Sequence, residues 1–165
     1  MHRLLLVAVF GMAFALPALA GGPIHIVQTQ GPLVYDSPAG EFCNFNYRQE
    51  YIITQNIKDF LDADGNVVSE VRNEELRNVH TNLDTGKTLI ETDHYTVHVN
   101  YVTGSVRQTG QVWHLRDEDG RLVLVGAGRF TMDAYTGEII SETPNVKFAN
   151  FPQFVCPALG GAPPS

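Results

Sequence analysis

The stretch DHYTVHVNY, residues 93–101, indicates the fold because its side chains alternate between two kinds. One side is aromatic or aliphatic and carries Tyr95, Val97, Val99 and Tyr101. The other side is polar and carries His94, Thr96, His98 and Asn100. A period of two residues is typical of a β-strand with one buried face. The stretch therefore predicts a strand whose Tyr and Val side chains face the core and whose histidines face solvent.

The spacing of His94 and His98 resembles a metal-binding pair, but the strand makes that reading unfavourable. Residues four apart on a strand share a face and lie about 13 Å from each other. Two imidazoles on one ion need metal–nitrogen bonds of about 2.1 Å. A partner on a neighbouring strand, such as His80 or His114, is the alternative that would still form a site. We expect neither a metal nor another cofactor.

Glycine-containing turn signals separate the strand-like segments on both sides of this stretch. They are D-A-D-G at 62–65, D-T-G at 84–86, T-G at 103–104, T-G at 109–110, D-E-D-G at 117–120 and T-G at 136–137. Glycine supplies the positive φ that tight hairpins need, and aspartate caps such turns. This pattern predicts an all-β fold, a single antiparallel up-and-down β-barrel of about eight strands. A β-sandwich is the alternative.

Three other segments refine this expectation. A first long strand is predicted by the alternation of Phe45, Tyr47, Tyr51, Ile53 and Ile57 with polar residues. EVRNEELRNV, residues 70–79, predicts two short strands meeting near Asn73 rather than a short helix. LVLVGAGRF, residues 122–130, is apolar on both sides, and its glycines predict a bend or bulge.

The ends of the chain differ from this central part. Residues 1–20 combine Arg3, an apolar run from Leu4 to Leu16 and the small-x-small sequence Ala18-Leu19-Ala20. This predicts a secretory signal peptide cleaved after Ala20, because the run is shorter than the ~20 residues that a membrane anchor needs. We further expect an irregular arm at 21–41 with at most one short strand, the barrel domain at 42–159 and a disordered tail at 160–165.

The two cysteines, Cys43 and Cys156, lie near the two ends of the predicted domain. Outside the cytosol an isolated pair usually forms a disulfide, so we expect a bridge. Two free buried thiols are the alternative.

The charge of the chain argues against nucleic acid as a partner. Removal of the predicted signal peptide takes away Arg3. It leaves 10 Lys and Arg against 18 Asp and Glu, a net charge of −8. Such a chain repels phosphate backbones. No second apolar stretch is long enough to span a membrane.

Familiar catalytic motifs are missing from the sequence. No serine stands in a G-x-S-x-G elbow, and there is no P-loop or dinucleotide fingerprint. The segment D-A-D-G-N at 62–66 places its glycine too early for a calcium-binding EF-hand loop. We therefore interpret it as a hairpin turn.

The chain resembles a group of small secreted bacterial proteins of the lipocalin-like or allene-oxide-cyclase-barrel-like kind. The resemblance covers roughly residues 42–159 and is carried by FCNFNYRQEY, by the hairpin T-N-L-D-T-G-K at 81–87 and by V-C-P-A-L at 155–159. It implies a barrel and brings no activity with it.

The functional expectation is a secreted barrel that binds a small apolar molecule or acts as an extracellular accessory protein. Predicted ligand-binding residues are the inward aromatic side chains Tyr51, Tyr95, Tyr101, Trp113 and Phe130. One alternative is an isomerase- or cyclase-type enzyme with Glu50 or Glu91 as its acid. An inward acid with a raised pKa among the aromatic residues would favour that alternative. A structural or interaction module without a ligand is the other.

Overall fold

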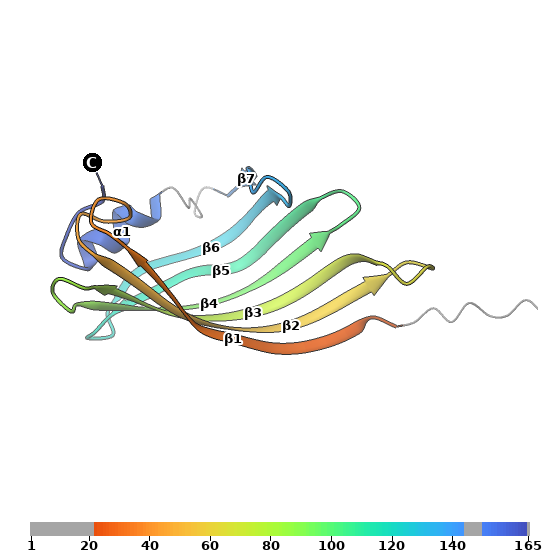
Figure 1. Cartoon of the computed structure of the whole chain (residues 1–165), viewed down its shortest axis with the longest axis horizontal. Helices are drawn as coiled ribbons and strands as arrows, with labels where there is room; N and C mark the ends of the chain where they lie inside the picture. Colours follow the sequence, from red (N-terminus) through yellow and green to blue (C-terminus); the bar gives the residue numbers. More distant parts are fainter. Residues whose placement is uncertain (1–21, 144–149, 165) are drawn as a thin grey trace, which may run out of the picture.

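The computed structural model describes residues 22–143 and 150–164, and it contains one antiparallel sheet with its seven strands in sequence order (Figure 1). The strands are β1 (Ile24–Ser37), β2 (Tyr47–Leu61), β3 (Val67–Asn82), β4 (Thr88–Asn100), β5 (Ser105–Asp117), β6 (Leu122–Asp133) and β7 (Ile139–Glu142). A helix, α1 (Phe151–Ala158), follows them. The prediction of an all-β fold is confirmed.

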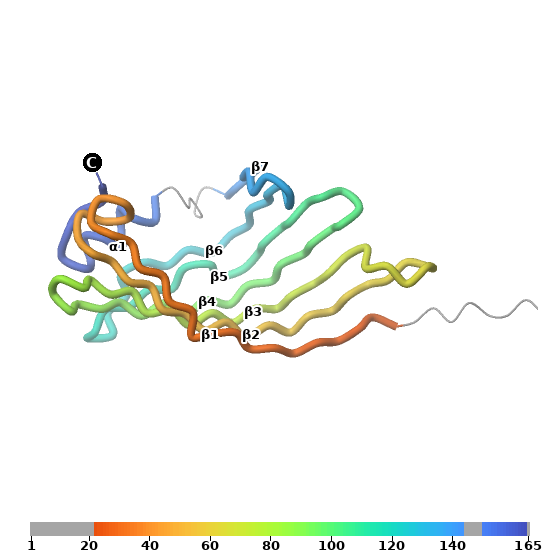
Figure 2. The backbone as a smooth tube through the Cα atoms, in the orientation of Figure 1, coloured from red at the N-terminus to blue at the C-terminus, as the bar shows by residue number. Residues whose placement is uncertain are grey.

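The predicted closed barrel is wrong, and so is the alternative of a two-sheet sandwich. Within the described ranges, β1 pairs with β2 alone and β7 pairs with β6 alone, so the sheet stays open. The backbone trace shows a curved trough with these two strands along its opposite edges (Figure 2). The last strand is also short, because β7 has four residues against 14 in β1 and could pair with only a small part of that edge.

Five of the predicted glycine turns are confirmed as hairpin connections. The glycines at 65, 86, 104, 120 and 137 have φ between 63° and 85°. In the first of these turns Asp62 Oδ1 accepts hydrogen bonds from the backbone N–H groups of Asp64 and Asn66. D-A-D-G-N is therefore a hairpin turn, as predicted.

The turn predicted at Thr109-Gly110 is wrong, because both residues lie inside β5. Gly110 has φ 135°, and a Cβ there would lie 2.7 Å from the carbonyl oxygen of His94 on β4. The glycine thus permits close approach of two strands rather than a reversal of the chain.

The two short strands predicted within residues 70–79 are one continuous strand, β3. Asn73, the expected junction, pairs with Asn56 on β2 and with Thr96 on β4. Because neighbours on both sides supply ladder hydrogen bonds, the polar sequence of this segment does not interrupt the strand.

The N-terminal arm predicted as irregular is mostly strand. Residues 24–30 and 33–37 of β1 form a ladder with β2 that is interrupted between Gln30 and Leu33. Most of its side chains are exposed, which explains why the segment lacks a clear alternation of apolar and polar residues.

The C-terminal segment returns to the beginning of the sheet. The predicted disulfide between Cys43 and Cys156 is present, with a Cα–Cα distance of 5.6 Å, and it is consistent with an extracellular protein. Residues 160–164 do not follow the prediction of disorder, because Ala162 exchanges hydrogen bonds of 2.8 and 2.9 Å with Asn44. Among residues 22–143 and 150–164, no helix has the length and hydrophobicity to cross a bilayer.

The densest core lies between α1 and one end of the concave face of the sheet. Its fully buried members include Tyr47, Leu89, Leu115, Val155 and Leu159. Figure 1 shows α1 at this one end of the sheet.

Candidate functional site

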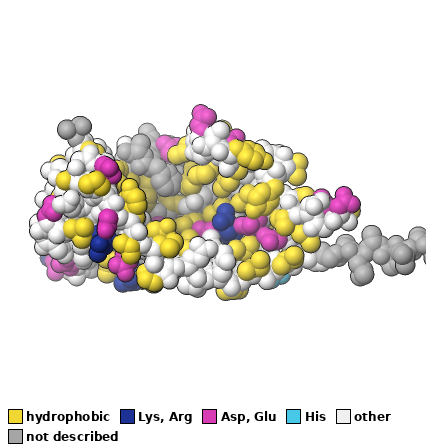
Figure 3. Space-filling model, in the orientation of Figure 1, with side chains coloured by type: hydrophobic (Ala, Val, Ile, Leu, Met, Phe, Trp, Pro, Cys, Tyr) yellow, Lys and Arg dark blue, Asp and Glu magenta, His cyan; other side chains and the backbone are white. Residues whose placement is uncertain are grey.

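A cavity of about 560 Å³ opens on the concave face beside α1. Hydrophobic side chains border the hollowed face, and acidic and basic side chains are visible among them (Figure 3). The cavity is lined by residues of β2 to β6, of the turn between β6 and β7, of β7 itself and of α1. Its volume is that of a site for one small organic molecule.

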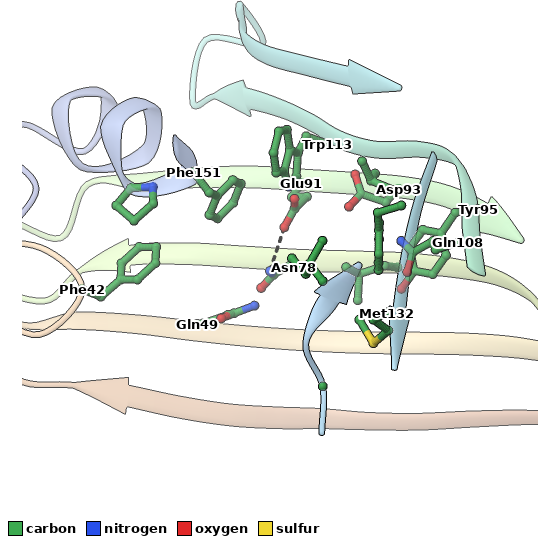
Figure 4. Close-up of a pocket in the computed structure, with 16 residues that line it drawn as sticks. Phe42, Gln49, Asn78, Glu91, Asp93, Tyr95, Gln108, Trp113, Met132 and Phe151 are labelled. Atoms are coloured by element: carbon green, nitrogen blue, oxygen red, sulfur yellow. Dashed lines mark hydrogen bonds between the residues drawn. The ribbon is translucent and has the colours of Figure 1, made fainter. Parts of the chain in front are cut away.

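Aromatic side chains form the end of the cavity near α1 (Figure 4). Phe151, at the start of α1, stacks on Trp113 with ring centroids 5.5 Å apart. Phe151 also packs against Phe42, with ring centroids 6.3 Å apart. Large apolar lining residues are Phe42, Leu76, Val112, Trp113, Phe130, Met132, Ile139 and Phe151.

Polar side chains occupy the middle and the far end of the same cavity. They are Gln49, Asn78, Glu91, Asp93, Tyr95 and Gln108. The register of the sheet groups them, because Asn78 on β3 is paired with Glu91 on β4. Glu91, Asp93 and Tyr95 alternate along β4 and therefore share its concave face.

Glu91 is buried and held by two side chains of β3. Its Oε2 lies 2.8 Å from Nδ2 of Asn78 and 2.9 Å from Nε2 of His80. The other ring nitrogen of His80 contacts the hydroxyl of Tyr47 on β2. Burial, and next the charge of Glu91, raise the pKa of Tyr47, so this phenol keeps its proton. A buried hydrogen-bond chain thus runs across β2, β3 and β4.

Asp93 is the strongly perturbed acid of the cavity. Burial raises the pKa of Asp93 to about 9, and the charge of Glu91 and a hydrogen bond with it act in the same direction. The backbone N–H of His114, which donates to Oδ1 at 3.0 Å, opposes this rise only in part. At neutral pH Asp93 therefore holds a proton beside Glu91.

Asn78 presents an acceptor that nothing in the described ranges occupies. Its side chain is fully buried, and its Nδ2 donates to Glu91. This donation fixes the amide orientation, because a carboxylate only accepts hydrogen bonds. The Oδ1 atom has no hydrogen-bond partner among the described residues. A buried acceptor without a partner is costly, so a bound donor would stabilise it.

The structure brings three of the five predicted ligand-binding residues into the cavity and leaves two outside its lining. Tyr95, Trp113 and Phe130 line it. Tyr51 is half-buried on β2 beyond the lining. Tyr101 lies in the turn after β4, is 46% exposed and donates its hydroxyl hydrogen to Glu70.

Of the two acids proposed for an enzyme, only Glu91 lies in the cavity, since Glu50 is exposed on β2. Sequence reasoning missed Asp93, although it stands in phase with Tyr95 at the start of the alternating stretch. No sequence pattern identified Asn78 or Phe151. Asn78 reaches the site through the pairing of β3 with β4, and Phe151 reaches it because α1 packs beside the cavity.

The histidines of the alternating stretch lie on the convex face, as predicted. His94 is largely exposed, with Nδ1 3.9 Å from Oε1 of Glu75. The suggested cross-strand partners do not join it, because His80 bonds to Glu91 and Nδ1 of His114 lies 3.1 Å from Oγ1 of Thr92. Within residues 22–143 and 150–164 no three metal-ligating side chains gather.

No model of a known protein family matches the chain, and neither curated proteins nor solved structures include a significant match to it. The resemblance to lipocalin-like secreted proteins therefore stays a prediction. The geometry of the cavity is the basis of the functional proposal that follows.

Proposed function

We propose that this protein is secreted and binds a small, mostly apolar molecule in the cavity beside α1. The observation that supports it most directly is the combination of an aromatic wall with a few convergent polar groups in a space of about 560 Å³. This combination is the usual form of a small-molecule site. Trp113 and Phe151 would contact the apolar body, and Asn78 and Asp93 would bind its polar end.

Secretion rests on two features of different kinds. The first is the signal-like sequence of residues 1–20, which lies outside the described residues. The second is the Cys43–Cys156 disulfide, which is typical of oxidising compartments.

Trp113 provides a direct test of binding, because it is the one tryptophan of the chain and it lines the cavity. Titration with 4-phenylbutanol and with decanol should shift its fluorescence in a saturable way. Tyr95→Ala should weaken this binding, and Tyr101→Ala, the matched control outside the lining, should not. No saturable shift with any apolar probe, or equal loss in both variants, would contradict the proposal.

A second candidate, an isomerase-type enzyme, is favoured by Asp93. A protonated carboxyl beside a second carboxyl among aromatic side chains resembles an acid–base pair. In this version Glu91 removes a proton from carbon beside the carbonyl of a bound β,γ-unsaturated ketone, and Asp93 delivers one at the γ-carbon. The conjugated product is detected by its ultraviolet absorbance. Activity that survives in Asp93→Asn would exclude this role for Asp93.

A further inference from the structure

We propose that the cavity is selective for apolar amines, molecules with an aromatic or aliphatic body and a protonated amino group. This inference rests on the proposed binding function and adds the charge of the ligand to it. Three properties of the cavity support it: its charges, its hydrogen-bonding atoms and its aromatic wall.

The charges that line the cavity have one sign. Glu91 and Asp93 are its carboxyl groups, and no lysine or arginine of the described residues lines it. Arg72, which shares a face of β3 with the lining residue Asn78, is already engaged, with its Nε 2.6 Å from Oε1 of Glu70 and 3.5 Å from Oε1 of Glu74. The residues of α1 beside the cavity carry no charge. A bound anion would therefore add a further negative charge without a counter-charge.

Several hydrogen-bond acceptors of the cavity lie close together on β3 and β4. Oδ1 of Asn78 has no partner among the described residues, and Glu91 and Asp93 supply carboxyl oxygens. An ammonium group has three donors and no acceptor, so it matches this set. A carboxylate ligand has acceptors alone and would leave Asn78 Oδ1 unpaired.

The aromatic wall suits both parts of such a molecule. Trp113 and Phe151 stack on each other at one end, and Asn78, Glu91 and Asp93 lie next to them along the cavity (Figure 4). An aromatic or aliphatic body can therefore pack on the rings while its amino group reaches the carboxyl groups. A cation close to aromatic faces is further stabilised by the ring quadrupoles.

The affinity for an amine should depend on pH through Asp93. The groups that interact with it are Glu91 and Tyr95 from β4 and the backbone N–H of His114 from β5. From β3, Glu74 acts on Tyr95 and His80 bonds to Glu91. A bound ammonium favours the ionised form of Asp93, so binding at neutral pH releases a proton from it. Amine affinity should therefore increase as the pH rises toward the pKa of Asp93, about 9.

Three probes with one body test the inference: 4-phenylbutylamine, 4-phenylbutanol and 4-phenylbutyrate, measured by calorimetry at pH 7.5. The amine should bind roughly tenfold or more tightly than the alcohol, and the carboxylate should bind most weakly. Calorimetry in buffers of different ionisation enthalpy should show proton release with the amine and none with the alcohol.

Two variants that each replace one carboxyl group by an amide serve as a matched pair. Asp93→Asn should bring the amine-to-alcohol affinity ratio close to one. Glu75→Gln, on the convex face, should retain the ratio of the unmodified protein. An alcohol or carboxylate that binds as tightly as the amine would overturn the inference and leave the binding function intact. Absence of binding by all three probes would overturn both.

Discussion

The Nε2 atom of His80 lies 2.9 Å from Oε2 of Glu91, in a region where His80 is fully buried and Glu91 is 3% exposed. Because a carboxylate accepts, Nε2–H of His80 donates. Nδ1 then faces the hydroxyl of Tyr47. The imidazole of His80 thus connects Tyr47 in the core with Glu91 in the cavity. Its removal should affect the hydrogen bonding of both.

Replacement of His80 tests this connection. His80→Leu should lower the free energy of unfolding by about 2–4 kcal/mol, because it leaves the buried Glu91 and Tyr47 each with one fewer partner. His80→Gln retains a hydrogen-bond donor and an acceptor, so its free energy of unfolding should fall clearly less than that of His80→Leu. Equal loss in the two variants, measured by urea denaturation, would mean that packing rather than hydrogen bonding governs this position.

Asp93 should make stability decline as the pH rises. Its folded-state pKa is about 9 and its ordinary value is 3.8, so the unfolded chain loses this proton at much lower pH than the folded chain does. The stabilising contribution is therefore complete below about pH 4 and is lost progressively up to about pH 9, by at most about 1.4 kcal/mol per pH unit. Asp93→Asn should raise the melting temperature at pH 8, and this gain should vanish near pH 4. A variant that melts below the unmodified protein at pH 8 would contradict the assignment.

Loss of the disulfide should release the C-terminal segment. The Cys43→Ser, Cys156→Ser double variant lacks a bridge that spans 113 residues, so its free energy of unfolding should fall by about 2–5 kcal/mol. Guanidinium denaturation measures this loss, and thiol titration of the unmodified denatured protein should find no free thiol. An unchanged midpoint would show that the bridge contributes nothing to stability.

Phe151 should control the environment of Trp113. Phe151→Ala removes the stacked ring and widens the cavity, so Trp113 emission should move to longer wavelength and apolar probes should bind more weakly. Phe154, on the same helix, is 45% exposed and does not line the cavity, so Phe154→Ala is the matched control. Similar spectra for both variants would argue against contact between α1 and the cavity.

Secretion remains to be tested on the intact chain. Mass spectrometry of the exported protein should give a mature N-terminus at Gly21, because small residues precede it in the cleavage sequence. Cell-associated protein that retains residues 1–20 would indicate an anchor instead.

Local features of the sequence determined the strands and most of their connections. The alternation in residues 93–101 predicted β4, because the period of side-chain direction is a property of the extended backbone itself. Gly65, Gly86 and Gly120 predicted hairpins, because a positive φ is a local requirement. The disulfide was predictable from cysteine number and compartment.

Tertiary structure alone decided that the sheet stays open and where its site lies. Whether the first and last strands meet depends on the curvature and length of the whole sheet, which no single turn encodes. Asn78 and Glu91 are 13 positions apart and become neighbours through strand register, and Phe151 reaches Trp113 because the chain returns after β7. The raised pKa of Asp93 has the same origin, since burial and the charge of Glu91 exist only in the folded chain.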